Sequence, residues 1–305
     1  MRTIKLSAPA TIANVGPGYD IFAMALAHPR DEFEISLNDS GKVRITIENN
    51  TENIPLEPEY NSAGLATLKF LEKFNLSHGV DLKIVKSIYS GGGMGTTGAS
   101  AAACVFGLNR LLGTNLSQNE LVNIGRLGEV ASGGSPHADN IAAALLGGFT
   151  LVRSYHPLDV LKLDLPEFPV VFAAIRKSVR TTRGYISYEV GEDKLKDQIA
   201  HCSSVIHAIH MKDIREFGRA VCVDHIAEPV RAVSIPNYFE AKKLILKAGA
   251  YGCNVSGGGS SVFALCAENK QDEIAAIMRE KFSESPKFID VLLTKTSNLG
   301  VLEMG

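Results

Sequence analysis

The segment from Tyr89 to Leu112, YSGGGMGTTGASAAACVFGLNRLL, combines residue types that can bind an anion. Its clustered glycines allow the backbone to bend sharply and to approach a ligand closely. Thr96 and Thr97 add two hydroxyl groups at the start of a predicted helix, where unpaired N–H groups and the helix dipole favour negative charge. Small residues follow, so a phosphate group has room against the first helical turns. The segment predicts a phosphate-binding loop, with a glycine-rich turn capped by threonine as the alternative.

The glycines at 93, 95 and 98 also match the spacing of dinucleotide-binding proteins, which raises the question of an NAD site. Such a site needs a strand, a glycine turn, a helix and then a second parallel strand. Here the helix predicted over residues 99–112 is followed by SQNELVNIGRLGEVA (117–131), whose periodicity and Ser117–Glu120 capping box predict another helix. No Gly-Lys-Ser/Thr follows the glycines either. The sequence therefore disfavours both an NAD site and a Walker loop.

The overall composition excludes several classes of function. The chain has 305 residues, of which 45% are hydrophobic and 21% charged, with a formal net charge of -2. This balance gives no reason to expect nucleic acid or an anionic membrane as a partner. The longest apolar runs are too short to span a bilayer, and no signal peptide is recognisable. Five scattered cysteines without a Cys-x-x-Cys pair argue against a zinc site or a disulfide framework, so we expect a cytoplasmic protein with reduced thiols.

The elements that must position the loop follow from apolar periodicity along the chain. Strands are expected within residues 3–11, 31–37, 42–49, 80–88, 147–155, 160–165, 168–176, 261–266 and 288–295. Besides the two helices above, helices are expected within residues 61–74, 194–211, 213–224, 237–249 and 270–282. Strands cluster early, whereas helices and strands mix later. This order predicts an α+β protein of two domains, residues 1–155 and 156–305.

Two further glycine-marked segments stand on either side of the loop in the sequence. They are APATIANVGPGYDIFAMAL (8–26) and NVSGGGSSVFALC (254–266). Together with the loop, they resemble the three motifs of the kinase superfamily that includes galactokinase, homoserine kinase, mevalonate kinase and phosphomevalonate kinase. The resemblance implies an ATP-binding N-terminal domain of the ribosomal-S5-domain-2-like type and a C-terminal ferredoxin-like α/β-sandwich domain. It also implies ATP and Mg²⁺ as cofactors.

Within this superfamily, two longer segments resemble the homoserine kinase family. They are GEVASGGSPHADNIAAALLGGFTLV (128–152) and AEPVRAVSIPNYFEAKKL (227–244). The resemblance implies an enzyme that phosphorylates the hydroxyl of L-homoserine in threonine biosynthesis. Two alternatives stay open, namely another small-molecule kinase of the superfamily and a catalytically silent relative that only binds. A homodimer is expected from base rates for soluble enzymes.

The resemblance assigns residues to the nucleotide and the metal ion. Thr97 and Glu129 are expected to hold Mg²⁺, which favours one or two protein oxygens together with substrate phosphates. A solvated carboxylate on a helix is the alternative for Glu129. Asn61 resembles an asparagine that contacts adenine, although it can equally cap a helix. The expected ATP-binding residues are Asn61, Gly91, Gly92, Gly93, Met94, Gly95, Thr96, Thr97, Gly98, Ala99 and Ser100.

The resemblance also assigns an acceptor site. Asp20 suits the α-ammonium group of homoserine, and the arginines suit its carboxylate because a guanidinium meets a carboxylate in two parallel hydrogen bonds. His137, Asn140 and Arg183 are expected to act closest to the reaction, with His137 positioning substrate rather than carrying a proton. The expected substrate-binding residues are Asn14, Asp20, His137, Asn140, Arg183 and Arg231.

One position bears on the mechanism. Mevalonate-type relatives carry an aspartate before the Gly-Gly pair that can act as a base, whereas the ungapped equivalent here is Asn140, with Asp139 one residue away. Since asparagine cannot accept a proton, we expect direct attack of the hydroxyl on the γ-phosphorus without an enzymic base. Positioning and charge neutralisation supply most of the acceleration in phosphoryl transfer.

Three places depart from the family pattern. The third motif has Gly257-Gly258-Gly259-Ser260-Ser261 where a proline is usual, and the loop has two threonines instead of two serines. The segment VRTTRGYISYEVG (179–191) keeps Arg183 but lacks the usual Ala and Leu-Pro. This last departure leaves room for a shifted acceptor preference.

Overall fold

A long antiparallel hairpin organises the first half of the chain. In the computed structural model, which describes residues 2–132, 135–176 and 190–305, β1 (Thr3–Ala13) pairs with β2 (Phe22–Asn38) along almost its whole length. β11 (Leu302–Glu303) lies beside β1, β4 (Gly79–Val85) lies beside β2, and β3 (Val43–Glu48) runs parallel to β4. β5 (Phe149–Tyr155) pairs with both β2 and β6 (Leu158–Leu163) and completes a seven-stranded sheet.

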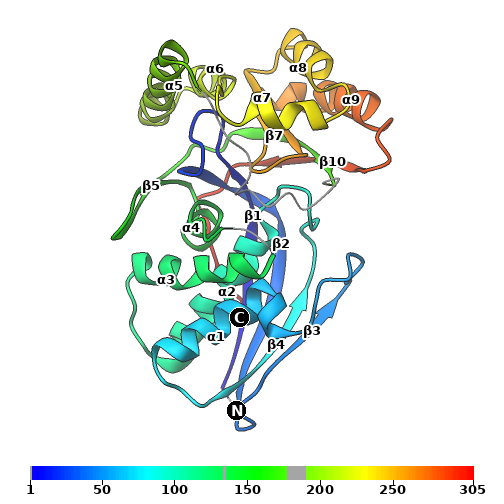
Figure 1. Ribbon diagram of the computed structural model, residues 1–305. Coiled ribbons are helices and arrows are strands. Elements are labelled where there is room, and N and C mark those ends of the chain that lie inside the picture. The colour runs from blue at the N-terminus through cyan, green and yellow to red at the C-terminus, as the bar shows by residue number, and fades with distance from the viewer. Residues whose placement is uncertain (1, 133–134, 177–189) are drawn as a thin grey trace.

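Helices cover one face of this sheet (Figure 1). They are α1 (Ser62–Lys73), α2 (Thr96–Leu112), α3 (Gln118–Gly125) and α4 (Asp139–Leu146), with 3₁₀ turns η1 (Pro58–Tyr60) and η2 (Arg126–Ser132). α2 is almost entirely buried, and it approaches the sheet closely at Gly107. A Cβ atom there would lie only 2.6 Å from Cδ1 of Ile35 and 3.0 Å from Cδ1 of Leu6. The small residues of α2 therefore allow the helix to lie directly on the hairpin.

The second half of the chain forms a separate antiparallel sheet with its own helical layer at the upper end of Figure 1. The strand order is β10 (Phe288–Lys295), β7 (Pro169–Ile175), β9 (Val262–Leu265), β8 (Gly252–Val255). Its helices and turns are α5 (Glu192–Met211), α6 (Ile214–Val221), α7 (Glu228–Arg231), η4 (Ala232–Ser234), α8 (Tyr238–Lys247), η5 (Glu268–Lys270) and α9 (Gln271–Phe282). Val171 and Ala173 pack in a core of their own with Ile245 and Phe282.

The structure confirms the expected α+β class. The predicted boundary at 155/156 falls in the turn between β5 and β6, and both of these strands belong to the first sheet. The sheets change over between Leu163 and Pro169, and β11 returns from the second sheet to the first. The exact division into domains stays a prediction.

Several local expectations need correction. The single helix expected over 117–131 is α3 followed by the 3₁₀ turn η2, although the capping box of Ser117 and Glu120 is present as expected. The tighter turn brings Gly128 against α1, where a Cβ atom would lie 2.6 Å from the carbonyl oxygen of Ser62. α2 begins at Thr96, three residues before the expected start. α4, β8 and β11 were not expected at all.

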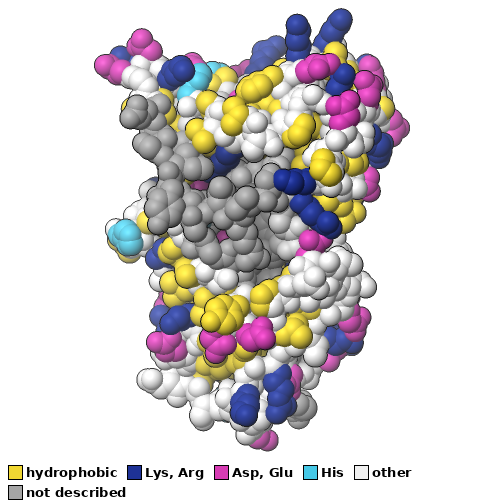
Figure 2. Space-filling model, turned by 45° about the vertical axis from the view of Figure 1, so that its right-hand side comes forward, with side chains coloured by type: hydrophobic (Ala, Val, Ile, Leu, Met, Phe, Trp, Pro, Cys, Tyr) yellow, Lys and Arg dark blue, Asp and Glu magenta, His cyan; other side chains and the backbone are white. Residues whose placement is uncertain are grey.

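The face of the molecule in Figure 2 shows no bias toward one sign of charge among the described residues. On the face in Figure 2, basic and acidic side chains among the described residues are interspersed over both halves of the molecule. Within the described part of the chain, no helix is long and apolar enough to cross a membrane. The interspersed charges on this face agree with the balanced composition.

Candidate active site

The glycine loop joins β4 to α2 and is shaped by three left-handed residues. Gly91, Gly93 and Gly95 have φ angles of 74°, 72° and 67°, a backbone region that favours glycine. Gly95 is the N-cap of α2, so Thr96 and Thr97 occupy its first turn. The N–H groups of this turn have no partner within the helix, which makes the end of α2 suitable for an anion.

The three glycine-marked segments meet at this loop. The N–H of Thr11 donates to the carbonyl oxygen of Met94 (3.0 Å), and the Ser256 hydroxyl donates to that of Gly93 (2.7 Å). The N–H of Gly257 donates to the carbonyl oxygen of Ala13 (3.0 Å). A Cβ atom at Gly93 would lie 2.9 Å from the Ser256 carbonyl oxygen. Segments that are far apart in the sequence thus form one packed junction.

A cleft opens beside the loop and is called here the nucleotide cleft. It has an apolar wall and a polar end, which suits a base at one side and phosphates at the other. It is lined by Ile47, Ile54, Pro55, Tyr60, Asn61, Ser62, Ile84, Lys86, Ser90, Thr96, Thr97 and Ser100. Four residues expected to bind ATP therefore share one cavity, namely Asn61, Thr96, Thr97 and Ser100.

Asn61 has the capping role that was the alternative for it. Its side-chain oxygen accepts from the N–H groups of Ala63 (3.0 Å) and Gly64 (3.3 Å), and its Nδ2 donates to the carbonyl oxygen of Pro55 (2.7 Å). An amide nitrogen carries two hydrogens, so one remains for a ligand in the cleft. The adenine contact stays a prediction.

Sequence reasoning missed a buried ion pair at the polar end of the cleft. Lys86 is paired with the fully buried Asp31, and its Nζ also donates to the hydroxyls of Thr96 (2.5 Å) and Ser100 (3.4 Å). Asp31 also accepts from the N–H groups of Ser87 (2.7 Å) and Ile88 (2.8 Å). Burying a charge is unfavourable unless it is paired, so this pair fixes an ammonium group beside the first turn of α2. A lone Lys and a lone Asp gave no pattern to detect.

Glu129 lies on η2, which packs against α1 and the first turns of α2. Its exposed fraction is 8%, so it is not the solvated carboxylate considered as the alternative. Next to it, a Cβ atom at Gly128 would contact Ala66 (3.0 Å) and Ala101 (3.3 Å). A buried carboxylate and the Thr97 hydroxyl are hard oxygen donors, which is the donor set that Mg²⁺ prefers.

Asp20 and His137 come together from two separate loops. His137 Nδ1 lies 3.5 Å from Asp20 Oδ2, and the N–H of Asp20 donates to the Asn14 side-chain oxygen (3.1 Å). Asp20 Oδ1 and His137 Nε2 are buried and have no hydrogen-bond partner in the described part of the chain. Buried polar atoms are normally satisfied, so these two indicate a place where a polar ligand binds.

Tyr155 holds these two loops together and was also missed. Its hydroxyl donates to the carbonyl oxygen of Asp20 (2.7 Å) and accepts from the N–H of Ala138 (3.4 Å). Burial, followed by the charge of Asp139, raises the pKa of Tyr155. Its phenol therefore stays protonated and can donate at any physiological pH.

Arg231 reaches the same region from α7. Its guanidinium donates to the carbonyl oxygen of Gly257, lies 5.3 Å from the centre of the Tyr19 ring, and is buried. The Nδ2 of Asn14 donates to the same Gly257 oxygen (3.4 Å). Arg183 lies outside the described residues.

Asn140 lies against the glycine loop and the Thr11 side chain. Its Oδ1 accepts from the Thr11 hydroxyl (2.7 Å), and a Cβ atom at Gly98 would lie 2.9 Å from its Cβ. The neighbouring Asp139 is buried, with Oδ1 accepting from the N–H of Asn140 (2.8 Å). The structure therefore brings Asn14, Asp20, His137, Asn140 and Arg231 around one end of the phosphate loop.

Comparison with known proteins gives this arrangement a family. The GHMP kinases N terminal domain matches residues 60–148, and the GHMP kinases C terminal domain matches residues 205–284. Homoserine kinases from Methanococcus vannielii (37% identity, 93% of this chain and 94% of the relative) and Chlorobium phaeobacteroides (35%, 92% and 92%) are similar along most of the chain. The chain belongs to the GHMP kinase family, among the homoserine kinases.

The fold agrees with this membership. A homoserine kinase from Cytophaga hutchinsonii superposes with a TM-score of 0.89 at 34% identity, covering 100% of this chain and 98% of that one. A mevalonate kinase from L. major superposes with a TM-score of 0.68 at 13% identity, covering 96% and 94%, and shows the fold alone. The motif at residues 8–26 lies outside both matched family domains, although it supplies Thr11, Asn14 and Asp20.

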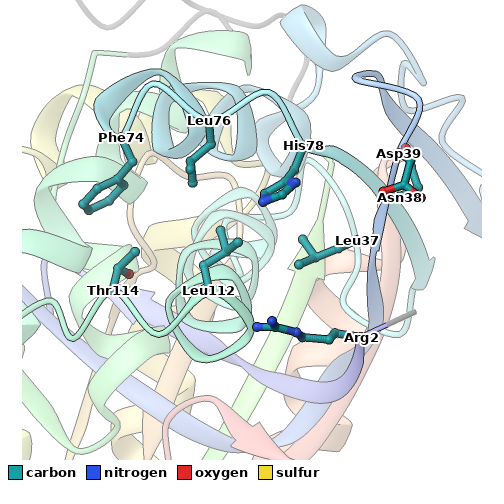
Figure 3. Close-up of a pocket in the computed structure, with 9 residues that line it drawn as sticks. All are labelled: Arg2, Leu37, Asn38, Asp39, Phe74, Leu76, His78, Leu112 and Thr114. Carbon is teal, nitrogen blue, oxygen red and sulfur yellow. The ribbon is translucent and has the colours of Figure 1, made fainter.

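A larger cavity of this GHMP kinase lies elsewhere. It has a volume of about 780 Å³ and contains none of the expected site residues. Figure 3 shows its lining side chains, which come from one end of the first sheet and from the C-terminal ends of α1 and α2: Arg2, Leu37, Asn38, Asp39, Phe74, Leu76, His78, Leu112 and Thr114. Size alone therefore does not locate the site, whereas the meeting of the three motifs does.

Proposed function

We propose that the protein is an ATP-dependent homoserine kinase that converts L-homoserine to O-phospho-L-homoserine in threonine biosynthesis. The observation that carries the acceptor assignment is the half-buried pair Asp20–His137, with one buried and unsatisfied polar atom on each residue, near the phosphate loop. An ammonium group supplies the donors that the Asp20 carboxylate lacks. The similarity to homoserine kinases supports this choice of amino acid.

The nucleotide is bound by backbone and cations. The N–H groups at the start of α2 bind phosphate oxygens, and the ammonium of Lys86 adds positive charge beside Thr96. The apolar wall of the nucleotide cleft accepts the base. Glu129 and Thr97 are the residues that hold Mg²⁺, and the metal ion neutralises charge on the phosphates when it is bound.

The acceptor is held by charge complementarity. Asp20 binds the α-ammonium group, His137 donates or accepts at its free Nε2, and Arg231 binds the carboxylate together with Arg183. The hydroxyl of the substrate then attacks the γ-phosphorus, ADP leaves, and the hydroxyl proton passes to the transferred phosphoryl group. Asn140 cannot take this proton, and Asp139 directs Oδ1 to the backbone N–H of Asn140.

A coupled ADP-release assay tests the proposed activity. It uses ATP, Mg²⁺ and a panel of L-homoserine, L-serine, L-threonine, mevalonate, pantoate and shikimate. We expect turnover with L-homoserine alone, and a loss of at least about 100-fold in Glu129→Ala because a metal ligand is removed. Turnover confined to another acceptor would mean that the altered segment around Arg183 has changed the preference. ATP binding without any turnover would favour a silent binding protein.

The mechanism without a base has its own test. The pH dependence of kcat is measured for Asn140→Asp and for Asp139→Asn. We expect Asn140→Asp to lose activity without gaining a new basic limb, and Asp139→Asn to keep most of its activity, because neither residue accepts the proton. A higher rate of Asn140→Asp at high pH, or an inactive Asp139→Asn that still binds both substrates, would show that a base is used.

A further inference from the structure

Thr11 connects the phosphate loop to Asn140 through two different groups. It lies on β1 where the pairing with β2 is irregular, between Pro9 and Thr11, and it is fully buried. Its backbone N–H donates to the Met94 carbonyl oxygen at 3.0 Å. Its hydroxyl donates to Asn140 Oδ1 at 2.7 Å. A Cβ atom at Gly95 would lie 1.9 Å from this hydroxyl, so the three residues are in direct contact.

The hydroxyl contact decides which end of the amide is presented to a ligand. An asparagine side chain has one end that only accepts hydrogen bonds and one that only donates them. With Oδ1 directed to the Thr11 hydroxyl, the Nδ2 end of Asn140 is the end left for other partners. Negative charge develops on the substrate hydroxyl oxygen and on the phosphoryl oxygens. An N–H group stabilises this charge, whereas a carbonyl oxygen would repel it.

We propose that Thr11 is a positioning residue that orients the Asn140 amide so that its N–H groups, and not its carbonyl, meet the reacting oxygens. This inference rests on the proposed kinase activity and refines it. Asn140 is not simply a base that has been lost. It is a fixed hydrogen-bond donor, and the hydroxyl of Thr11 fixes it.

The test compares Thr11→Val with Thr11→Ser. Valine keeps the shape and the backbone bond to Met94 but removes the hydroxyl, whereas serine keeps the hydroxyl. We expect kcat of Thr11→Val to fall about 10- to 100-fold, since small errors of alignment are costly in phosphoryl transfer. KM for ATP should stay within about twofold, and Thr11→Ser should keep kcat within about threefold of the parent.

A matched control removes a different buried hydroxyl from the same sheet. Thr150 on β5 is fully buried and its hydroxyl donates to the Ala23 carbonyl oxygen (3.4 Å). Thr150→Val should leave kcat unchanged, even if its melting temperature falls. An equal loss of kcat in Thr150→Val and Thr11→Val would mean that only general packing is involved, which overturns the proposal.

A double-mutant cycle identifies Asn140 as the target. Thr11→Val should have no further effect on kcat in an Asn140→Ala background, because no amide remains to be oriented. Additive losses would overturn the proposal. If Thr11→Val does not fold, Thr11→Cys replaces it, since a thiol is a weak donor. A kcat between those of Thr11→Ser and Asn140→Ala supports the proposal, and full activity of the cysteine variant contradicts it.

The outcomes separate this inference from the proposed function. A parent enzyme that phosphorylates L-homoserine, together with fully active Thr11→Val, removes the role of Thr11 and leaves the kinase assignment intact. A parent enzyme without activity on L-homoserine removes the kinase assignment itself. Equal impairment of Thr11→Val, which keeps the methyl group, and Thr11→Ser, which keeps the hydroxyl, indicates that the packing of the whole side chain matters rather than the hydroxyl alone, which also overturns the proposal.

Discussion

The two ends of the proposed site, called here the phosphate end and the acceptor end, are built in opposite ways. The phosphate end comes from one continuous segment and consists mainly of backbone, with three left-handed glycines before the start of α2. The acceptor end consists of side chains from separate segments, namely Asp20, His137, Asn140 and Arg231. One end is fixed by local conformation, and the other by tertiary hydrogen bonds.

This difference predicts two kinds of failure. Because a backbone cradle has no side chain to remove, it fails when an added side chain distorts it, and transfer from ATP is then lost for every acceptor. In a pocket made of side chains, each substitution removes one contact with the substrate. Single substitutions there should raise KM for L-homoserine and leave ATP binding intact. The predictions below test this division, beginning with the largest effect.

Gly95→Ala should have the largest effect. The new Cβ atom would lie 1.9 Å from the Thr11 hydroxyl and 2.8 Å from Asn140 Oδ1, and φ at this position is 67°. The loop must shift, and we expect kcat/KM for ATP to fall at least about 100-fold. Steady-state kinetics with varied ATP and calorimetric titration of nucleotide measure this loss.

Gly91→Ala is the matched control for Gly95→Ala. Gly91 has a similar φ of 74°, but a Cβ atom there has no neighbour within 4 Å. Gly91→Ala therefore adds only the backbone strain of a left-handed alanine, about 1 kcal/mol, and we expect the activity of this variant to fall about tenfold or less. Equal losses in the two variants would mean that backbone conformation, and not the contact with Thr11 and Asn140, limits the loop.

The second prediction concerns the acceptor end. Asp20→Asn keeps the shape but removes the negative charge that we propose binds the α-ammonium group, so KM for L-homoserine should rise about 10- to 100-fold. KM for ATP should stay within about twofold, because Asp20 belongs to the other end. A variant that instead lost affinity for ATP would show that the two ends are not separable. Steady-state kinetics with each substrate varied in turn distinguish these cases.

The phosphate end could be predicted from the sequence because its determinants are local. Glycines, hydroxyls and a helix start are all contained in ten consecutive residues, and the chemistry of the helix N-terminus does not depend on the rest of the fold. Even here the start of α2 was placed three residues too late, since small residues have weak periodicity. The same locality explains why the capping box of Ser117 and Glu120 was found.

The acceptor end was only partly predictable. The resemblance named Asp20, His137 and Asn140, which the structure brings near one another, but it did not name Thr11 or Tyr155, because each makes a side-chain contact with a residue more than a hundred positions away. Lys86 and Asp31 were missed for the same reason, being 55 positions apart in the sequence. Such contacts depend on sheet register and loop packing, which no local pattern in a single sequence encodes.

Tyr155→Phe should have a smaller effect than Asp20→Asn. It removes only the hydroxyl that joins the Asp20 loop to the His137 loop, a contribution of about 0.5–1.5 kcal/mol. We expect KM for L-homoserine to rise about three- to tenfold with kcat nearly unchanged. Tyr251→Phe is the control, because the Tyr251 ring lies near Arg215 (5.3 Å), as the Tyr155 ring lies near Arg126 (5.9 Å), but in the second half of the molecule. Similar changes in both variants would speak against a role at the acceptor end.

The smallest effect is expected at Asp224, which anchors α7 and thereby Arg231. Its buried carboxylate accepts from the N–H groups of Ile226 (2.9 Å), Ala227 (2.8 Å) and Glu228 (3.1 Å), and burial raises its pKa above 3.8. The folded state therefore holds the proton to higher pH than the unfolded state does, and this group's contribution to stability declines as pH rises through that window.

Asp224→Asn cannot titrate at this position. The difference in free energy of unfolding between variant and parent should therefore have one part that is constant with pH and one part that changes with pH. The lost acceptor for the Glu228 N–H lowers the free energy of unfolding by about 1 kcal/mol at every pH. Because the parent loses stability as pH rises from 4 to 7 and the variant has no such charge, the difference between their free energies of unfolding becomes smaller over this range. Urea unfolding of both proteins across this range measures the difference. A difference that does not change with pH would mean that the three N–H groups fully offset the cost of burying the charged Asp224 carboxylate. The start of α7 would then be as insensitive to pH as the backbone of the phosphate loop.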